Sequence, residues 1–229
     1  MKNIVVLTGA GMSAQSGIST FRDSGGLWEN YPVLQVASIE GWHANPQLML
    51  DFYNRRRASL KNAQPNKGHM ILAELEQHFH VKIITQNIDD LHERAGSTNI
   101  LHLHGELTKA QSSEDPDLIT HIGYDPIAWG DKAADGSQLR PHVVWFGEPV
   151  PNMTKAIQWT QEADIMIVAG TSLAVYPAAG LVDFAQDSIP LFLIDPKPAP
   201  VRRNNLYVIA DKAVEGLGKI KKTLIENYL

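Results

Sequence analysis

The sequence predicts an α/β protein in which helices cover both faces of a doubly wound parallel sheet. The first observation is a series of short apolar runs bounded by turn residues, which is the pattern of buried parallel strands. The runs are residues 4–7, 81–85, 100–103, 142–146, 165–169, 191–194 and 206–209. The second observation is helical periodicity between several of them, at residues 46–61, 67–79, 88–95, 151–162 and 213–227. Strands that alternate with helices favour such a sheet.

Two segments interrupt this alternation. Residues 29–66 carry helical patterns without a clear strand, and residues 106–140 are polar and rich in turn residues. We interpret both as insertions that together form a smaller lobe. The expected organisation is a single domain with a large lobe of residues 1–28, 80–105 and 141–229 and a small lobe of residues 29–79 and 106–140.

Composition narrows the class of protein further. With 229 residues and 44% hydrophobic content, the chain can bury the core of one large domain. Its net charge of −5 disfavours a general nucleic-acid binder. No apolar run approaches the ~18 residues of a membrane span, and a strand begins at Ile4, so we expect no leader, no membrane and a cytoplasmic location. The absence of cysteine excludes disulfides, thiolate metal sites and cysteine nucleophiles.

A glycine-rich turn follows the first predicted strand. Gly9 and Gly11 permit a tight turn with exposed backbone N–H groups, and the helix that follows would direct its positive end at a pyrophosphate. The alternative is a plain strand-to-helix connection. No strand ends in an acidic residue about 20 positions further on, where dehydrogenases hold the adenosine ribose. Asp195, after residues 191–194, is the candidate for that ribose, or else a turn residue before Pro196.

Amide and carboxylate side chains follow the strand predicted at residues 81–85. The carboxyl ends of parallel strands are where such sheets bind ligands. Asn87 and Asp89 would supply the donor and acceptor that a neutral amide such as nicotinamide requires. The alternative for Asp89 is a helix cap.

Two histidines close the next predicted strand. His104 stands where that strand runs into a glycine, at the same edge of the sheet, and an imidazole near its ordinary pKa suits a general base. His102 lies on the same strand face, which raises the alternative of a metal pair with Glu106 as the nearby carboxylate. Because no cysteine is available, we favour a structural His102 and expect no metal.

Taken in order, six motifs resemble the sirtuin family of NAD-dependent protein deacylases over nearly the whole chain. They are GAGMSAQSGISTFRD, TQNIDDLHERAG, HLHGEL, RPHVVWFGE, GTSLAVYPA and FLID. A set of ordered motifs is far more specific than any one of them. The resemblance implies a Rossmann-like large lobe, NAD as cofactor, and acylated-lysine proteins or peptides as substrates.

The resemblance also implies residue roles. The glycine motif would wrap NAD, residues 86–89 would form the nicotinamide site, and His104 matches the catalytic histidine. Asp195 stands where many members carry asparagine, and it keeps an acceptor for a ribose hydroxyl. The implied cofactor-binding residues are Gly9, Ala10, Gly11, Ala14, Phe21, Arg22, Gln86, Asn87, Ile88, Asp89, Gly170, Thr171, Ser172, Asp195 and Ala213.

The implied reaction joins the acyl group to ADP-ribose. The amide oxygen of an acylated lysine would attack the nicotinamide ribose, and nicotinamide would leave. An alkylimidate would result, and His104 would activate a ribose hydroxyl that attacks the imidate carbon. Water would complete the cycle, releasing free lysine and O-acyl-ADP-ribose. Holding nicotinamide away from water would be the main contribution of the region around Phe21 and Asn87.

One departure from the family concerns zinc. Most sirtuins bind zinc through four cysteines after the catalytic histidine, and residues 106–140 contain none. We therefore expect no zinc there. A small apolar core would stabilise the lobe instead, unless these are scattered surface side chains. Its members would be Leu118, Ile119, Ile122, Tyr124, Ile127 and Trp129.

A second set of residues bears on the acyl group. Tyr53 and Arg56 are one turn apart on a predicted helix and match the pair of class III sirtuins, which remove succinyl, malonyl and glutaryl groups. Arginine offers a planar fork to a carboxylate, and a tyrosine hydroxyl adds a donor. Ala37 matches a small residue that leaves room for a longer acyl chain. The alternative is a basic, solvated helix face.

Two rival functions stay open at this point. One is an ADP-ribosyltransferase or NAD glycohydrolase, which would use the same cleavage of NAD without requiring acyl-lysine. The other is a non-catalytic NAD-sensing module, which would have no need of a base at His104. The sequence leaves the oligomeric state, the protein targets and the preferred acyl chain open.

Overall fold

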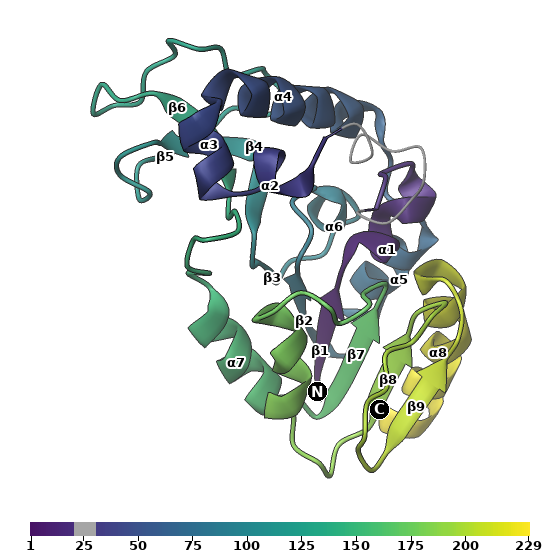
Figure 1. Ribbon diagram of the computed structural model, residues 1–229. Helices are drawn as coiled ribbons and strands as arrows, with labels where there is room; N and C mark the ends of the chain where they lie inside the picture. The colour runs from purple at the N-terminus through teal and green to yellow at the C-terminus, as the bar shows by residue number, and fades with distance from the viewer. Residues whose placement is uncertain (21–30) are drawn as a thin grey trace.

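Six strands form a parallel sheet in the lower half of Figure 1, in the order β3-β2-β1-β7-β8-β9. The structure is a computed structural model that describes residues 1–20 and 31–229. The strands are β1 Asn3–Thr8, β2 His80–Thr85, β3 Ile100–His102, β7 Ile165–Ala169, β8 Leu191–Ile194 and β9 Leu206–Ile209. The chain runs outward from β1 to β3, returns to the centre at β7 and continues outward on the other side. The predicted doubly wound α/β fold is therefore confirmed.

The central strands are buried on both faces, which explains their continuously apolar sequences. In β1, Ile4 and Val6 belong to one core, Val5 and Leu7 belong to the other, and all four are fully buried. Figure 1 shows α8 and α7 on opposite sides of the sheet. The covering helices are α5 Lys67–Leu75 and α8 Ala213–Tyr228 on the first face, and α7 Met153–Gln161 and a 3₁₀ helix Ala178–Phe184 on the second.

A smaller lobe at the top of Figure 1 combines helices with an antiparallel sheet in the order β5-β4-β6. Its elements are α2 Val33–Val36, α3 Ile39–Ala44, α4 Pro46–Asn62, β4 Gly105–Ser112, β5 Ile119–His121 and β6 Leu139–Val143. Helix α4 begins where the Asn45 side chain accepts a hydrogen bond from the Leu48 N–H. Pro46 occupies the first turn, where no N–H donor is needed.

The structure corrects the prediction for residues 142–146. They were expected to form a parallel strand of the large sheet, whereas the strand at this point is β6, which pairs antiparallel with β4. Residues 106–140, expected as turns, contain β4 and β5. The chain passes from β3 of the large sheet directly into β4 and comes back through β6, with no helix between β4 and β6. Parallel strands need a crossover connection, usually a helix, so these two strands pair antiparallel. The polar side chains of β4 concealed this strand in the sequence.

Two helices also differ from their predictions. The helix expected at residues 88–95 is shorter, because α6 spans only Leu91–Arg94. Helix α5 was assigned to the smaller lobe, but Leu72 and Leu75 share the core of the large sheet with α8. On this packing we propose that residues 67–79 belong to the larger lobe and that the smaller lobe extends to residue 146.

The small apolar core expected in residues 106–140 forms only in part, and it joins the core built on α4. Tyr53 and Trp145 are members of that core. Of the six residues predicted for it, Ile127 is buried, Leu118, Ile122 and Tyr124 are half-buried, and Ile119 and Trp129 are exposed.

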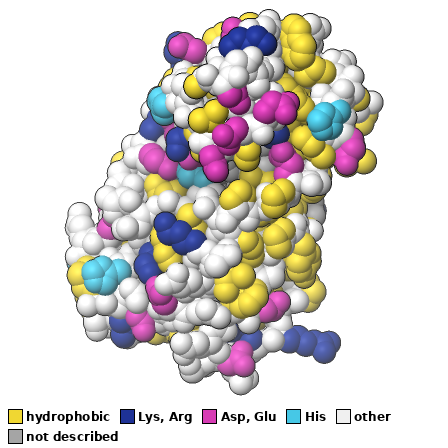
Figure 2. Space-filling model, turned by 90° about the vertical axis from the view of Figure 1, so that its left-hand side faces the viewer, with side chains coloured by type: hydrophobic (Ala, Val, Ile, Leu, Met, Phe, Trp, Pro, Cys, Tyr) yellow, Lys and Arg dark blue, Asp and Glu magenta, His cyan; other side chains and the backbone are white. Residues whose placement is uncertain are grey.

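The outer face of the smaller lobe is acidic. Figure 2 views the molecule from the left-hand side of Figure 1 and shows acidic side chains gathered over the upper part. Exposed carboxylates of this lobe include Glu114, Asp115, Asp117, Asp125, Asp131 and Asp135. Within residues 1–20 and 31–229, none of the helices is both long and apolar enough to cross a bilayer.

Candidate active site

The site lies where the strand order reverses, between β1 and β7. In doubly wound sheets, ligands bind at this point, outside the carboxyl ends of the strands. The turn after β1, residues 9–11, here called the glycine turn, meets the turn after β7 at Gly170. A Cβ atom on Gly9 would lie 2.7 Å from the Thr171 Cβ, and one on Gly11 would lie 2.8 Å from the Gly170 Cα. Glycine is required because the two turns touch.

One expectation about the glycine turn was wrong. The amide groups of its two glycines are not free, because the Gly9 N–H donates to the Ala169 carbonyl oxygen (3.2 Å) and the Gly11 N–H donates to the Gly170 carbonyl oxygen (2.9 Å). Helix α1, Ala10–Ser13, is also only one turn long, so it has little dipole to offer. The glycines therefore serve close packing of two turns. Ala10 and Ala14 are half-buried there, and Phe21 and Arg22 lie outside the described residues.

Residues 86–89, here called the amide loop, follow β2 at the same edge of the sheet. The Gln86 side chain donates to the Thr171 Oγ1 (3.1 Å), which joins the ends of β2 and β7. The Asn87 N–H donates to the Thr85 Oγ1 (3.0 Å). The backbone of Ile88 is held from the other lobe, since its carbonyl accepts the Leu107 N–H at 2.8 Å.

The polar side chains of the amide loop converge on Ser13, which sequence reasoning missed. The buried Ser13 Oγ accepts from the Asn87 Nδ2 (3.1 Å) and donates to the Asp89 Oδ2 (2.9 Å). Burial raises the pKa of Asp89, opposed by these hydrogen bonds. The other Asp89 oxygen accepts the Leu91 N–H at the first residue of α6, although the N-cap residue of that helix is Asp90. Ser13 follows the glycine turn in the first motif, which was its only signal.

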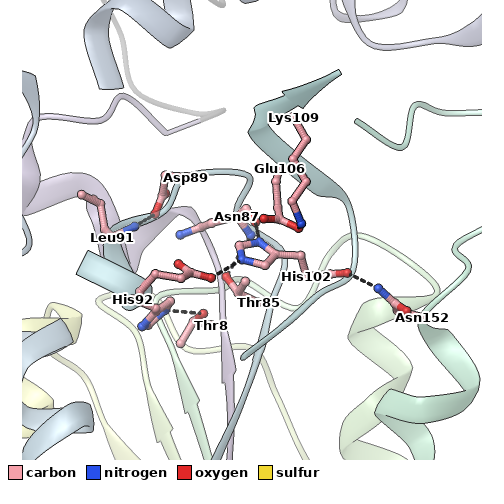
Figure 3. Close-up of polar contacts among 11 residues, drawn as sticks. Thr8, Thr85, Asn87, Asp89, Leu91, His92, His102, Glu106, Lys109 and Asn152 are labelled. Carbon is pink, nitrogen blue, oxygen red and sulfur yellow. Dashed lines mark hydrogen bonds and ion pairs between the residues drawn. The ribbon is translucent and has the colours of Figure 1, made fainter. Parts of the chain in front are cut away.

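A pair of buried histidines, His69 and His92, lies next to this network. Sequence reasoning did not identify this pair either. His69 accepts the Asn66 N–H at Nδ1, so its proton is on Nε2, 3.5 Å from the Ser13 Oγ. Its ring lies 4.8 Å from the ring of His92, which contacts the Thr8 Oγ1 (Figure 3). Burial lowers the pKa of His69 to about 4 and that of His92 below its ordinary value. Both rings are therefore neutral near pH 7.

His104 lies in the turn between β3 and β4, between the two lobes. Its Nδ1 is 3.0 Å from the Gln86 carbonyl oxygen. A carbonyl only accepts hydrogen bonds, so the proton is on Nδ1 and Nε2 keeps its lone pair. Burial lowers the pKa of His104, opposed by the contact with Gln86. The next residue, Gly105, has φ +79, a conformation that favours glycine, and β4 begins there.

His102 and His104 do not converge on a metal. The ring of His102 contacts Asn87 and Glu93, and Glu106 pairs with Lys109 at 2.6 Å (Figure 3). Across residues 1–20 and 31–229, no group of three or more His, Asp or Glu side chains is arranged to hold a metal ion.

The remaining nucleotide candidates lie along the carboxyl edge of β7, β8 and the strand that precedes α8. Thr171 is buried and Ser172 half-buried, after β7. The Asp195 Oδ1 accepts the Lys197 N–H at 2.8 Å, so the predicted alternative of a turn residue is present, while the half-exposed side chain keeps a second oxygen. Ala213 is buried at the first position of α8.

Ala37, Tyr53 and Arg56 lie in the smaller lobe. Ala37 and Tyr53 belong to one core, and the Arg56 guanidinium carbon is 5.8 Å from the centroid of the Tyr53 ring. The predicted common helix face is therefore present. Burial raises the pKa of Tyr53 to about 12, so its hydroxyl stays protonated at neutral pH. Burial lowers the pKa of Arg56, opposed by Tyr53 and Asp89.

Trp145 holds the Tyr53 hydroxyl and was not identified from the sequence. Its indole N–H donates to the Tyr53 Oη at 2.9 Å. The buried Arg140 guanidinium lies 3.5 Å from the centroid of the Trp145 ring and makes two hydrogen bonds to Glu148, at 2.7 and 2.9 Å. Glu148 in turn accepts the Trp145 backbone N–H. With one acceptor position filled, the Tyr53 hydroxyl retains its proton for another partner.

These features define a class of protein: one with a doubly wound sheet that has a glycine turn at its switch point and a histidine with a free Nε2 beside an amide-lined loop. The chain belongs to the Sir2 family, whose family model matches residues 9–177.

Individual relatives agree with this assignment. A protein of Bacteroides thetaiotaomicron named NAD-dependent protein deacylase is 53% identical, over 98% of this chain and 99% of its own. One of Helicobacter pylori with the same name is 52% identical over 99% of both chains. Among solved structures, a complex of a Sir2 homologue with NAD has a TM-score of 0.87 and 38% identity, covering 97% of this chain and 89% of its own. A Sir2 complex with a deacetylated peptide and 3′-O-acetyl-ADP-ribose has a TM-score of 0.82 and 29% identity, covering 96% and 92%.

Proposed function

We propose that this chain is an NAD-dependent protein-lysine deacylase that transfers the acyl group to ADP-ribose and releases nicotinamide. The observation that carries the proposal is His104, whose free Nε2 lies beside the amide loop at the switch point of the sheet. Relatives about half identical along their whole length carry the name NAD-dependent protein deacylase. Sir2 structures with NAD and with a deacetylated peptide have the same fold.

The residues present fit NAD. The contact of the glycine turn with Gly170 leaves backbone without side chains at the carboxyl edge, where a pyrophosphate can approach closely. Thr171, Ser172 and Asp195 offer hydroxyl and carboxylate groups for the adenosine ribose and phosphates, and the amide loop offers both donors and acceptors for a carboxamide. When bound, NAD supplies an electrophilic ribose carbon and nicotinamide as its leaving group.

His104 acts as the general base in this proposal. The Gln86 carbonyl holds the proton on Nδ1 and thereby directs the lone pair of Nε2 outward, where it accepts a proton from a ribose hydroxyl. The lowered pKa of His104 keeps the ring neutral at pH 7, which is the form a base requires. The Gln86 contact also offsets part of the cost of charging the ring once it has taken the proton.

Ser13, Asn87 and Asp89 orient and desolvate the nicotinamide side. Because the three side chains are buried and hydrogen-bonded to one another, they hold one arrangement before any ligand binds. Preorganised dipoles in a dry site stabilise a reacting group without reorganisation when it reacts. The same burial limits the access of water to the ribose carbon.

We also infer a preference for acidic acyl groups such as succinyl. Arg56 supplies a cation near the Tyr53 ring. Burial keeps the Tyr53 hydroxyl protonated, and Trp145 holds it in place. A guanidinium and a hydroxyl together complement a carboxylate. Ala37 belongs to the same core as Tyr53 and has a small side chain.

The test of both proposals is a single assay with two readouts. The protein is incubated with NAD and a panel of acetyl-, malonyl-, succinyl- and glutaryl-lysine peptides, and both products are followed by mass. We expect nicotinamide release that depends on the acylated peptide, with O-acyl-ADP-ribose formed in equal amount. Nicotinamide release without acyl-lysine would favour a glycohydrolase, and ADP-ribosylated protein would favour a transferase. NAD binding without turnover would favour a sensing module.

A further inference from the structure

His102 occupies a position that the reaction described above leaves without a role. It ends β3, its ring is buried, and Figure 3 shows it beside Asn87. Its Nδ1 lies 3.1 Å from the Asn87 carbonyl oxygen, and its Nε2 lies 2.8 Å from the Glu93 carboxylate. A carbonyl and an ionised carboxylate both only accept hydrogen bonds. The ring therefore donates to both partners only as the imidazolium.

The Asn87 carbonyl is the middle one of three consecutive carbonyls held by the segment from β3 to β4. The contacts are His104 Nδ1 to the Gln86 oxygen, His102 Nδ1 to the Asn87 oxygen and the Leu107 N–H to the Ile88 oxygen. His102 is itself fixed, since its own carbonyl accepts the Asn152 Nδ2 at 2.8 Å (Figure 3). The segment from β3 to β4 therefore positions both the amide loop and His104. Within this segment, the His102 ring joins the amide loop to Glu93 of α6.

The groups around His102 stabilise its imidazolium form more than burial destabilises it. Burial alone would lower the pKa of His102, but the hydrogen bond and charge of Glu93, the charge of Glu106 and the Asn87 contact raise it above its ordinary value. The titratable and charged groups that face it are Glu93 and His92 of α6, Asp89 of the amide loop, Glu106 and Lys109 of β4 and His142 of β6. Glu93 is the one in direct contact, and its side chain is 40% exposed.

We propose that His102 is a positioning residue for the deacylation: clamped by Glu93, it holds the Asn87 carbonyl and so keeps the amide loop in register with His104. The inference rests on the proposed function for its kinetic consequence. Loss of the His102 proton removes one of the two donors. The neutral ring can donate its one proton either to the Asn87 carbonyl or to the Glu93 carboxylate. The lone pair of its other nitrogen then faces the oxygen of the second partner, which repels it.

The proposal gives the pH dependence a definite sign. The pKa of His102 is raised in the folded protein, so its contribution is complete below the ordinary histidine pKa and is lost as the pH rises through the raised value. His104 acts in the opposite sense, because a base must be deprotonated. We therefore expect kcat to decline on the alkaline side because of His102 and on the acidic side because of His104.

The first experiment compares the pH profiles of kcat for the wild type, Glu93→Gln and Glu162→Gln. Glutamine at position 93 can accept the Nε2 proton but carries no charge, so we expect the alkaline limb to move to lower pH with kcat below the limb nearly unchanged. Lowering the pKa by one would reduce the imidazolium fraction about tenfold at high pH, and kcat with it. Glu162 forms an exposed ion pair with Lys82 at 2.8 Å and is the matched control, with a profile that should overlay the wild type. An unmoved limb in Glu93→Gln would overturn the proposal.

The second experiment does not depend on catalysis. The ring protons of His102, assigned by comparison with His102→Gln, are titrated by NMR in the folded protein without ligand. We expect a pKa above the ordinary ~6.5 in the wild type and a lower one in Glu93→Gln. A wild-type value at or below the ordinary one would refute the inference even in an active enzyme. Absence of deacylase activity would instead count against the proposed function alone, because the titration would still report on the clamp.

Discussion

At the scale of a single residue, the position of His104 in the fold also sets the protonation of its ring. It stands between a strand of the large sheet and a strand of the small one, and its backbone neighbour Gly105 supplies the left-handed turn that redirects the chain. The hydrogen bond to Gln86 selects the tautomer with a free Nε2. A side chain in this position is held by both lobes, so its placement depends on how they pack.

Replacing His104 with alanine is expected to lower the rate of acyl transfer by ~10²–10⁴-fold, since that is the usual contribution of a positioned general base. NAD binding should change little, because the base acts after the dinucleotide has docked. Turnover is measured by the mass of O-acyl-ADP-ribose formed, and NAD affinity by calorimetry. Near-normal turnover by this variant would remove the assignment of His104 as the base.

Arg56 determines acyl preference in the proposed function, and Arg56→Met tests it. The substitution removes a charge-assisted contact that only an acidic acyl group can use. A hydrogen bond to a charged group is worth about 1.5–3 kcal/mol, so kcat/KM for succinyl-lysine should fall by roughly ten- to a hundredfold or more. Deacetylation should lose little, because an acetyl group has no carboxylate.

Arg55→Met is the matched control for that experiment. Arg55 is the preceding residue of α4 and is exposed, so the same chemical change should leave both activities near those of the wild type. Equal losses of desuccinylation and deacetylation in Arg56→Met would mean that Arg56 supports the fold or the NAD site instead. The preference for acidic acyl groups would then have to be dropped.

At the scale of elements, a cluster here called the serine clasp joins the ends of β4 and β6. The buried Ser112 Oγ donates to the Asp135 Oδ2 at 2.6 Å and lies 2.7 Å from the Ser137 Oγ. It also accepts the backbone N–H groups of Glu114 and Asp115. One hydroxyl thus ties the turn after β4 to the turn before β6. This clasp lies in residues 106–140, the segment in which most sirtuins carry the zinc-binding cysteines that this chain lacks.

Replacing Ser112 with alanine is expected to destabilise the smaller lobe, because the hydroxyl that joins the two turns is then lost and a typical hydrogen bond contributes about 0.5–1.5 kcal/mol. Unfolding in denaturant gives the magnitude, and hydrogen exchange across residues 105–143 locates it. The neighbouring Ser113→Ala is the control, since the clasp does not use that side chain. Equal stability of both variants would show that the clasp is incidental.

The clasp also has a pH dependence of known sign. Hydrogen bonds from Ser112 and Ser137 lower the pKa of Asp135. Stability from this group is therefore present above the ordinary aspartate pKa and is lost as the pH falls through the lowered one.

At the scale of the whole molecule, two lobes meet around the site without a thiolate metal centre. The chain has no cysteine, and the smaller lobe packs its sheet on α4 through Tyr53, Leu107, Val143 and Trp145. A core shared between α4 and the small sheet can take the place of a metal crosslink, because burial of apolar surface stabilises it directly.

Metal chelation is therefore expected to change neither the unfolding temperature nor the deacylase activity. Losing a structural zinc normally unfolds the element that it organises. Thermal unfolding and peptide turnover are measured with and without chelator, beside a cysteine-containing sirtuin that should lose both. Stoichiometric zinc by elemental analysis, with inactivation by chelator, would show that histidines or carboxylates replace the thiolates.

The doubly wound sheet was predictable because its strands are buried on both faces and so appear as continuous apolar runs, such as residues 4–7 and 165–169. The positions of His104 and the amide loop at one edge followed from the rule that parallel strands place their carboxyl ends together. The small sheet was not predictable, because β4 buries polar side chains such as Thr108 and Gln111 and therefore lacks an apolar pattern.

The sequence by itself determined the fold class, the order of the motifs and the choice of His104 as the candidate base. Those properties depend on local periodicity and on residue types that stand next to one another in the chain. Only the tertiary structure decided which side chains from different segments make hydrogen bonds to one another: Ser13 with Asp89, His102 with Glu93, and Trp145 with Tyr53. It also decided that the amides of Gly9 and Gly11 donate to carbonyl oxygens at the end of β7 and in the turn after it. Hydrogen bonds between distant segments depend on strand order and lobe packing, which no local pattern encodes.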